Sequence, residues 1–168
     1  WHLPVSLSPS PDTIDLITAR SETYKTPGAL PTVNPSTIEQ DLRRRDFTVN
    51  AMALRLDGDM FGEMLDPLAG QKDLEQGLLR VLHQRSFVDD PTRILRAIRY
   101  EARYSFKLEP STLSLINAEA LAVLSKLSGE RIRHELDLIL EEENSAKILS
   151  RLTDLDVFPS LPSFNKKY

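Results

Sequence analysis

The pattern of the sequence changes near residue 86, and this change constrains the fold more than any other feature. Before it, turn residues interrupt short apolar runs, and six of the eleven prolines lie in the first 35 residues. Proline fixes φ and removes a backbone donor, so such a stretch favours loops and short strands. After residue 86, apolar residues recur at helical spacing. The sequence therefore predicts an α+β chain, with a small mixed sheet in residues 1–85 and an all-α unit in residues 86–168.

Short elements are expected before residue 86. Residues 13–18 alternate and are rich in β-branched side chains, which predicts a strand with Asp15 on the face opposite Ile14 and Leu16. Residues 21–37 read mostly as loop, with a helix cap at Ser36 or Thr37. Two short helices are expected over residues 39–42 and 46–54. A hairpin over residues 54–65 should turn at Asp57-Gly58-Asp59, and a further strand is expected over residues 78–82.

Four helices are expected after residue 86. Asp90 followed by Pro91 is typical of an N-cap with proline at the first helical position, and this helix should run to about Ser105. A second helix should begin at Pro110 and carry one apolar face as far as Leu124. The third and fourth are predicted over residues 129–140 and 145–157.

Several classes of protein are excluded by composition. No run approaches the roughly 18 apolar residues of a spanning helix, and the first residues lack the layout of a signal peptide. We therefore expect a cytoplasmic protein with no membrane partner. The chain has no cysteine and only three scattered histidines, which excludes disulfides, thiol catalysis and a zinc cluster. Any metal ion would have to be bound by carboxylates.

Residues 43–50 form the first candidate binding group. Arg43, Arg44 and Arg45 lie beside Asp46 and Asn50 at a predicted helix start. Guanidinium groups suit phosphate oxygens, and carboxylate and amide groups suit ribose hydroxyls, so the group fits a phosphorylated sugar. A solvated basic turn in which Asp46 caps the helix explains the same residues equally well. Both interpretations stay open on spacing alone.

The helix that follows Asp90 forms the second group. Its pattern predicts one packed face and one basic face, and the basic face holds Arg93, Arg96, Tyr100 and Arg103. On composition alone, an ordinary surface helix with a capping Asp is the favoured interpretation. A sharper hypothesis follows from the hydrogen-bonding groups, because an ionised Asp90 only accepts and Arg93 only donates.

Cytosine and adenine share a pairing-edge pattern that this base-edge pair, Asp90 and Arg93, would complement. Both bases present a ring nitrogen acceptor beside an amino donor, whereas uracil and guanine present a carbonyl and a ring N–H. A rigid Asp/Arg pair would accept the first two bases and leave buried polar groups unpaired with the others.

Four segments together resemble a known family. They are residues 44–52 (RRDFTVNAM), 66–74 (DPLAGQKDL), 89–93 (DDPTR) and 130–136 (ERIRHEL). In this order and at these separations they resemble the class II tRNA nucleotidyltransferase and bacterial poly(A) polymerase family. The likeness spans nearly the whole chain, and its first segment is highly specific.

This resemblance implies a template-independent RNA 3′-end nucleotidyltransferase that transfers CMP or AMP from CTP or ATP to tRNA, with Mg²⁺ as cofactor. Poly(A) synthesis is the alternative within the family, and a non-catalytic RNA- or nucleotide-binding module is the alternative outside it. Residues 1–85 would be the later part of the nucleotidyltransferase head domain, and residues 86–168 would be the helical neck that binds RNA and nucleotide.

The resemblance also implies roles for single residues. Arg45, Asp46 and Asn50 would contact the sugar and phosphates of the incoming nucleotide. Asp90 and Arg93 would contact the base edge, with help from Arg96. Asp66, Gly70 and Asp73 would form a flexible element that couples the sheet part to the helices. Glu130 and Arg131 would brace the helical neck.

The family's paired metal-binding carboxylates, Asp-x-Asp after a glycine turn, have no match in this chain. Asp57 and Asp59 have the right spacing but lie after the RRD segment in a predicted hairpin turn, and are rejected. Asp15 lies where a third catalytic, metal-binding carboxylate would be. We therefore expect a fragment whose parent protein also supplies the rest of the head domain and a tRNA-binding C-terminal region. Alone, the chain is expected to be inactive, because two-metal phosphoryl transfer needs that carboxylate pair.

The net charge of −4 gives no sign of a nucleic-acid partner. Its distribution is more informative, because cations gather at residues 43–45 and along residues 93–103. Negative charge gathers instead in the later helices, at Asp137 and residues 141–143. The net charge therefore describes the later helices rather than the candidate site.

Overall fold

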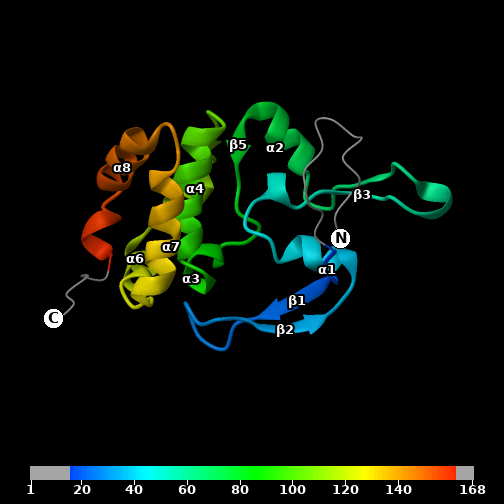
Figure 1. Cartoon of the computed structure of the whole chain (residues 1–168), viewed down its shortest axis with the longest axis horizontal. Coiled ribbons are helices and arrows are strands. Elements are labelled where there is room, and N and C mark those ends of the chain that lie inside the picture. The colour runs from blue at the N-terminus through cyan, green and yellow to red at the C-terminus, as the bar shows by residue number, and fades with distance from the viewer. Residues whose placement is uncertain (1–15, 162–168) are drawn as a thin grey trace.

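The computed structural model of the chain describes residues 16–161, and its fold is α+β (Figure 1). Most of the helices that follow residue 86 gather at one side of the molecule, and the described residues form three separate two-stranded sheets. Asp15 and most of the strand predicted over residues 13–18 lie outside the described residues. Leu16 to Thr18 are described and are not a strand, so the predicted strand is wrong over these residues.

The first sheet is an antiparallel hairpin that the sequence did not predict. Its strands are β1 (Arg20–Thr23) and β2 (Thr32–Pro35), paired so that Arg20 faces Pro35. Residues 21–37 were expected mostly as loop because turn residues dominate them. The turn signal was correct at Gly28, which has a φ of +72°, but the residues around it pair with each other.

The next elements only partly follow the predictions. Helix α1 (Ile38–Arg43) is confirmed, and its N-cap is Thr37, whose side chain accepts from the Gln40 N–H. The helix predicted over residues 46–54 shortens to a single 3₁₀ turn, η1 (Thr48–Asn50). It stops there because β3 (Ala53–Leu54) begins almost at once.

The predicted hairpin is confirmed, although its paired strands are short. Strand β3 pairs antiparallel with β4 (Met64–Leu65), and the 3₁₀ turn η2 (Gly58–Met60) lies between them. An unpredicted helix, α2 (Gly70–Gln76), follows and is capped by Gly77 in the left-handed conformation. The strand predicted over residues 78–82 is confirmed as β5 (Leu78–Leu79), which pairs parallel with an unpredicted strand, β6 (Lys107–Leu108).

The helical unit begins with the short helix α3 (Ser86–Asp89), followed by α4 (Thr92–Arg103). The helix predicted from Pro110 to Leu124 is two helices, α5 (Pro110–Ser114) and α6 (Ala118–Leu124). They are separate because the Asn117 side chain caps the second one, accepting from the Ala120 N–H at 3.1 Å. The chain then forms α7 (Gly129–Leu140), α8 (Ser145–Asp154) and the 3₁₀ turn η3 (Phe158–Ser160), close to the predicted bounds.

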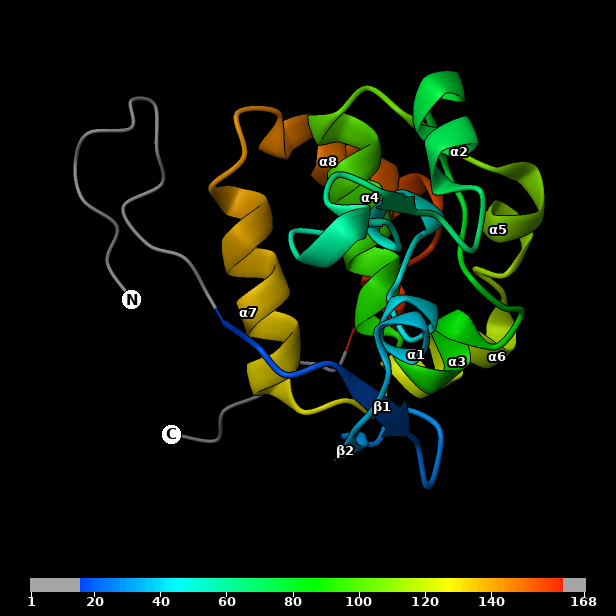
Figure 2. The ribbon, with the colours of Figure 1, turned by 90° about the vertical axis from the view of Figure 1, so that its right-hand side faces the viewer.

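Helix α4 lies at the centre of the helical unit and packs against α7 and α8 (Figures 1 and 2). Its apolar face, with Ile94, Leu95 and Ile98 fully buried, belongs to one hydrophobic core. The same core includes Phe47 and Leu79, which precede residue 86. The first turn of α4 is thus held against elements from both parts of the chain. None of the described helices is long and apolar enough to cross a membrane.

Candidate functional site

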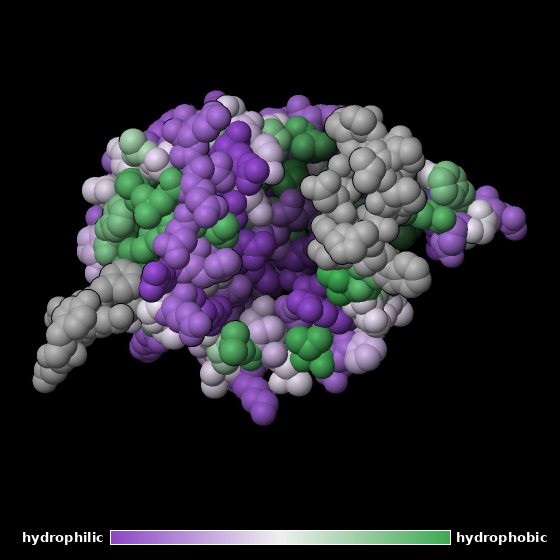
Figure 3. All heavy atoms as spheres, viewed as in Figure 1, coloured by the Kyte–Doolittle hydropathy of each residue, from purple (hydrophilic) through white to green (hydrophobic). Residues whose placement is uncertain are grey.

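A polar cavity of about 730 Å³ opens between α4 and α7 on one side and β1, α1 and η1 on the other. Figure 3 shows a strongly hydrophilic hollow on this face. Six arginines and four carboxylates line the cavity, so it is positively charged although the whole chain is negative. All six residues predicted to bind nucleotide line it, namely Arg45, Asp46, Asn50, Asp90, Arg93 and Arg96.

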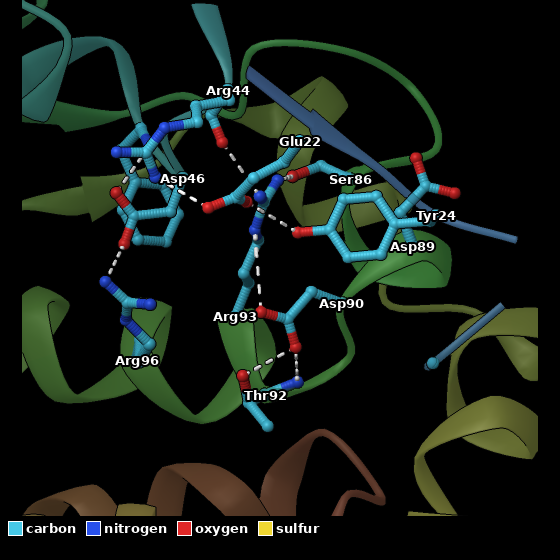
Figure 4. Close-up of polar contacts among 12 residues, drawn as sticks. Glu22, Tyr24, Arg44, Asp46, Ser86, Asp89, Asp90, Thr92, Arg93 and Arg96 are labelled. Carbon is cyan, nitrogen blue, oxygen red and sulfur yellow. Dashed lines mark hydrogen bonds and ion pairs between the residues drawn. The ribbon is translucent and has the colours of Figure 1, made fainter. Parts of the chain in front are cut away.

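Asp46 links η1 to α4 at the floor of the cavity. The side chain is 5% exposed, and its Oδ1 accepts from the Phe47 N–H and the Asn50 amide, both at 2.9 Å. Its Oδ2 forms an ion pair with Arg96 at 2.6 Å, shown in Figure 4, but has no aligned hydrogen bond among the described residues. Asp46 therefore fixes Asn50 and Arg96 relative to each other.

The neighbouring arginines are paired with carboxylates rather than free. Arg44 contacts Asp41 at 2.7 Å and Glu22 at 2.8 Å, and Arg45 contacts the other Asp41 oxygen at 3.0 Å. Although burial alone would raise the pKa of Asp41, hydrogen bonds from Arg44, the Arg20 backbone and Arg45 hold it below its ordinary value. The solvated basic turn, one of the two interpretations left open for residues 43–50, is therefore an ion-pair network, in which Arg45 is more exposed than Asp41.

Tyr24 and Glu22 form one wall of the cavity. The Tyr24 hydroxyl donates to Glu22 Oε2 at 3.1 Å. Burial, together with the nearby Glu22 carboxylate, raises the pKa of Tyr24 to about 12. The hydroxyl is therefore neutral at physiological pH and is a fixed donor to Glu22.

Asp90 has one occupied oxygen and one available oxygen. Its Oδ1 accepts from the Thr92 N–H at 3.2 Å, the Thr92 hydroxyl at 2.7 Å and Arg131 at 2.9 Å. Its Oδ2 lies 4.0 Å from Arg93 Nε, which is an ion pair but too long for a hydrogen bond. One carboxylate oxygen thus remains able to accept from a ligand beside Arg93.

Arg93 is buried, with 4% of its surface exposed, although the sequence predicted a basic helix face. Its Nη1 donates to Ser86 Oγ at 2.7 Å, and its Nη2 donates to the Arg44 carbonyl at 3.0 Å (Figure 4). Arg99, on the same helix, is also buried. The side chains of Arg96 and Arg103 are 33% and 50% exposed, so the predicted basic face of α4 is partly open to solvent but buried at Arg93.

Among the cavity residues that sequence reasoning missed are the polar side chains of Glu22, Tyr24 and Asp41. Glu22, Tyr24 and Asp41 lie in segments that lack a distinctive pattern, so no signal singled them out. Arg131 was implied only as a brace of the neck. It does tie α7 to the hairpin tip, by donating to the Gly28 carbonyl at 2.6 Å, but it also holds Asp90 and lines the cavity.

The residues implied as a coupling element, Asp66, Gly70 and Asp73, lie in or next to α2, which packs against η1. The Thr48 hydroxyl donates to Asp73 at 2.7 Å, and Arg80 pairs with the same carboxylate at 3.0 Å. The Asp66 carboxylate accepts from the N–H groups that begin α2, at Gly70 and Gln71. These contacts join α2 to η1, and so to Asp46 and Asn50.

The described residues do not form a site that fits a magnesium ion. No group of three His, Asp or Glu side chains suitable for a metal lies between residues 16 and 161. The cavity carboxylates Glu22, Asp41 and Asp46 are each paired with arginine. Asp15 lies outside the described residues, so its predicted catalytic and metal-binding role is untested.

Family models match both parts of the chain. Residues 4–80 match the poly A polymerase head domain, and residues 105–167 match the probable RNA and SrmB-binding site of polymerase A. The chain belongs to the tRNA nucleotidyltransferase and poly(A) polymerase family. Family membership agrees with the resemblance carried by residues 44–52, 66–74 and 89–93.

Individual members of this nucleotidyltransferase family are similar to the chain in sequence and in structure. The A-adding tRNA nucleotidyltransferase of Halalkalibacterium halodurans is 44% identical over 88% of this chain and 35% of its own length. A solved CCA-adding enzyme in apo form gives a TM-score of 0.84 at 47% identity, over 88% of this chain and 35% of that one. A tRNA nucleotidyltransferase complexed with a primer tRNA and an incoming ATP analog gives 0.73 at 37% identity, over 82% and 40%. The chain thus spans less than half the length of each.

Proposed function

We propose that this chain is the nucleotide-selecting part of a template-independent tRNA 3′-end nucleotidyltransferase, which transfers AMP or CMP from ATP or CTP. The observation that carries this proposal is the arrangement of the base-edge pair, Asp90 and Arg93, at the wall of a positively charged cavity. The two side chains offer one free acceptor oxygen beside free N–H donors.

The available donors follow from the contacts of Arg93. A guanidinium group has five N–H donors, and Ser86 and the Arg44 carbonyl each engage one of its terminal nitrogens. The remaining donors serve a ligand acceptor, while Asp90 Oδ2 serves a ligand donor. A cytosine or adenine pairing edge satisfies both groups, whereas uracil or guanine would leave buried polar atoms unpaired.

The charge of the cavity supports binding of a triphosphate. Arg45 and Arg96 are partly exposed within it, and each is paired with only one carboxylate, Asp41 and Asp46 respectively. Guanidinium groups bind phosphate oxygens in a bidentate manner that suits this placement. The base-edge pair and these arginines would then hold opposite ends of one nucleotide.

The finer assignments draw on the relatives. The A-adding name of the H. halodurans relative favours AMP transfer, and the relative solved with a primer tRNA favours tRNA as acceptor. Mg²⁺ is proposed as the cofactor of the complete enzyme, with its carboxylate ligands outside the described residues. The partial coverage of the relatives named above, together with the head-domain match over residues 4–80, supports the interpretation of residues 1–85 as the end of the head domain and residues 86–168 as the neck.

Titration of the chain with ATP, CTP, GTP and UTP tests this proposal. We expect ATP and CTP to bind more tightly than GTP and UTP by about 10-fold or more, the range of one buried unpaired group. Arg93→Ala should abolish this preference, and Arg93→Lys, which keeps the charge but lacks the fork, should also reduce it. Circular dichroism shows whether each variant is folded.

The rival function, a non-catalytic RNA-binding module, gives a different result in the same experiment. Binding driven by phosphates alone would be equal for all four triphosphates and would weaken steeply with salt. That outcome would refute base selection by Asp90 and Arg93.

A further inference from the structure

Ser86 occupies a position that neither the resemblance nor the sequence pattern singled out. It is the first residue of α3 and is fully buried. Its hydroxyl accepts from Arg93 Nη1 at 2.7 Å, which is a short, charge-assisted contact. Its backbone carbonyl accepts from the Asp90 N–H at 3.1 Å. One residue therefore contacts both members of the base-edge pair.

Asp89 does not share this task. Its carboxylate lies 4.0 Å from His83 and 3.8 Å from Arg85, and no hydrogen bond or ion pair joins it to Arg93. Figure 4 shows it on the far side of Tyr24 from the guanidinium group. The acid that precedes Asp90 in the sequence therefore leaves the orientation of Arg93 to other groups.

We infer that Ser86 is a positioning residue for nucleotide selection, because it fixes the plane of the Arg93 guanidinium group. The second anchor is the Arg44 carbonyl, at 3.0 Å from Nη2. Two acceptors on different nitrogens prevent rotation of the planar fork, so its free N–H groups keep one direction relative to Asp90 Oδ2. Base discrimination depends on that direction, since a fork that turns can also satisfy the carbonyl of a wrong base.

The role of Ser86 in nucleotide selection rests on the proposed function, but its effect on the orientation of Arg93 does not. Two measurements test these two claims separately. Nitrogen-15 NMR of the Arg93 side chain reports rotation of the guanidinium group in the chain without nucleotide. Affinities for ATP, GTP, CTP, UTP and inorganic triphosphate report selection and phosphate binding.

Ser86→Ala removes the acceptor and is the decisive variant. We expect the ATP-to-GTP and CTP-to-UTP affinity ratios to fall by about 2- to 10-fold, the contribution of one hydrogen bond. The affinity for inorganic triphosphate should not change. The separate Arg93 Nη–H signals of the unmodified chain should merge as rotation becomes fast. Ser86→Thr, which restores the hydroxyl, should recover the ratios and the signals.

Asp89→Ala is the matched control, and it should change neither the ratios nor the Arg93 signals. If Ser86→Ala unfolds the chain, Ser86→Cys fills the same volume with a weak acceptor and carries the test. A folded variant with unchanged ratios and unchanged signals would overturn the role of Ser86 while leaving the proposed function intact. Should the unmodified chain show no nucleotide preference, the proposed function fails, and the NMR signals alone decide whether Ser86 holds Arg93.

Discussion

Gly70 has no room for a side chain, and this restriction is a consequence of how α2 meets η1. A Cβ atom there would lie 2.2 Å from the Thr48 carbonyl oxygen and 2.8 Å from its carbon. Both are backbone atoms, so they cannot move aside as a flexible side chain would. The close approach also sets the distance at which Thr48 donates to Asp73. Position 70 therefore requires glycine because of its close approach to the Thr48 backbone, and not because of an unusual φ.

Gly70→Ala should destabilise the chain by about 1–3 kcal/mol, the range of overpacking in a tight contact. Urea unfolding followed by circular dichroism measures the loss. Gly62→Ala is the control, because a Cβ there meets nothing within 4 Å and only the positive φ of +85° opposes it. We expect a smaller loss of about 1 kcal/mol from that strain. Equal losses in the two variants would contradict the importance of the Thr48 contact.

Cavity residues that lie close together in the sequence could be predicted. Cavity residues that only the fold brings together could not. Asp46 and Asn50, or Asp90 and Arg93, are near in sequence, so spacing and hydrogen-bonding groups were sufficient to select them. The partners that set their geometry come from elsewhere. Arg131 reaches Asp90 across 41 positions and the Arg44 carbonyl reaches Arg93 across 49, distances over which no local pattern operates.

At the scale of elements, apolar periodicity accounts for the successful predictions, and a cap inside one apolar face accounts for an error. Helices α4 and α7 have long apolar faces and clear start signals, and their predicted bounds were close. Where one apolar face continued from Pro110 to Leu124, periodicity could not detect the break that the Asn117 cap makes. Strand β6 has only two residues and owes its pairing to β5, which is distant in sequence, so the local pattern did not predict it.

The N-cap of α5 gives a pH-dependent prediction. Glu109 accepts from the Thr112 N–H at 3.0 Å and from the Ser111 hydroxyl, and it lies 3.4 Å from Arg80. The Ser111 hydrogen bond is the main reason that the pKa of Glu109 falls from 4.5 to about 2. The ionised Glu109 cap therefore stabilises the folded chain fully above about pH 4.5, and this stabilisation is lost as the pH falls towards 2. The reason is that the Glu109 carboxylate takes up a proton at a higher pH in the unfolded chain than in the folded one.

Glu109→Ala should lower the free energy of unfolding by about 1 kcal/mol at pH 7, the usual value of an N-cap. Urea midpoints of both chains at pH 7, 4 and 3 should converge as the pH falls. Glu109→Gln keeps an acceptor without the charge, so its difference from Glu109→Ala should not vary over this range. A gap between the unmodified chain and Glu109→Ala that stays constant to pH 3 would rule out the ionised cap.

Across the whole molecule, charge placement matters more than net charge. The chain carries −4, yet the polar cavity of about 730 Å³ is lined by more arginines than carboxylates. The predicted clusters of cations do meet there, but the Glu22 and Asp41 carboxylates, which no sequence pattern selected, neutralise part of their charge. Excess positive charge therefore gathers in the cavity, where it attracts an anion although the chain as a whole is negative.

The 168-residue chain with ATP, CTP, Mg²⁺ and a tRNA lacking its 3′ end should incorporate no nucleotide. The expected reason is that no described group of carboxylates suits a metal ion, and two-metal transfer needs such a clamp. Incorporation of labelled nucleotide, resolved on a denaturing gel, measures this directly. A longer relative, such as the H. halodurans enzyme, is the positive control, and product formed by the chain alone would refute the prediction.

The burial of Arg93 also affects how a protein of this kind can evolve. A buried guanidinium group whose donors hold Ser86 and the Arg44 carbonyl is part of the folded core, so replacing it endangers folding before it alters ligand choice. Selection for stability then protects the residue even when selection for function is relaxed. New nucleotide preferences should therefore arise first in the residues that surround Arg93, with Arg93 itself retained.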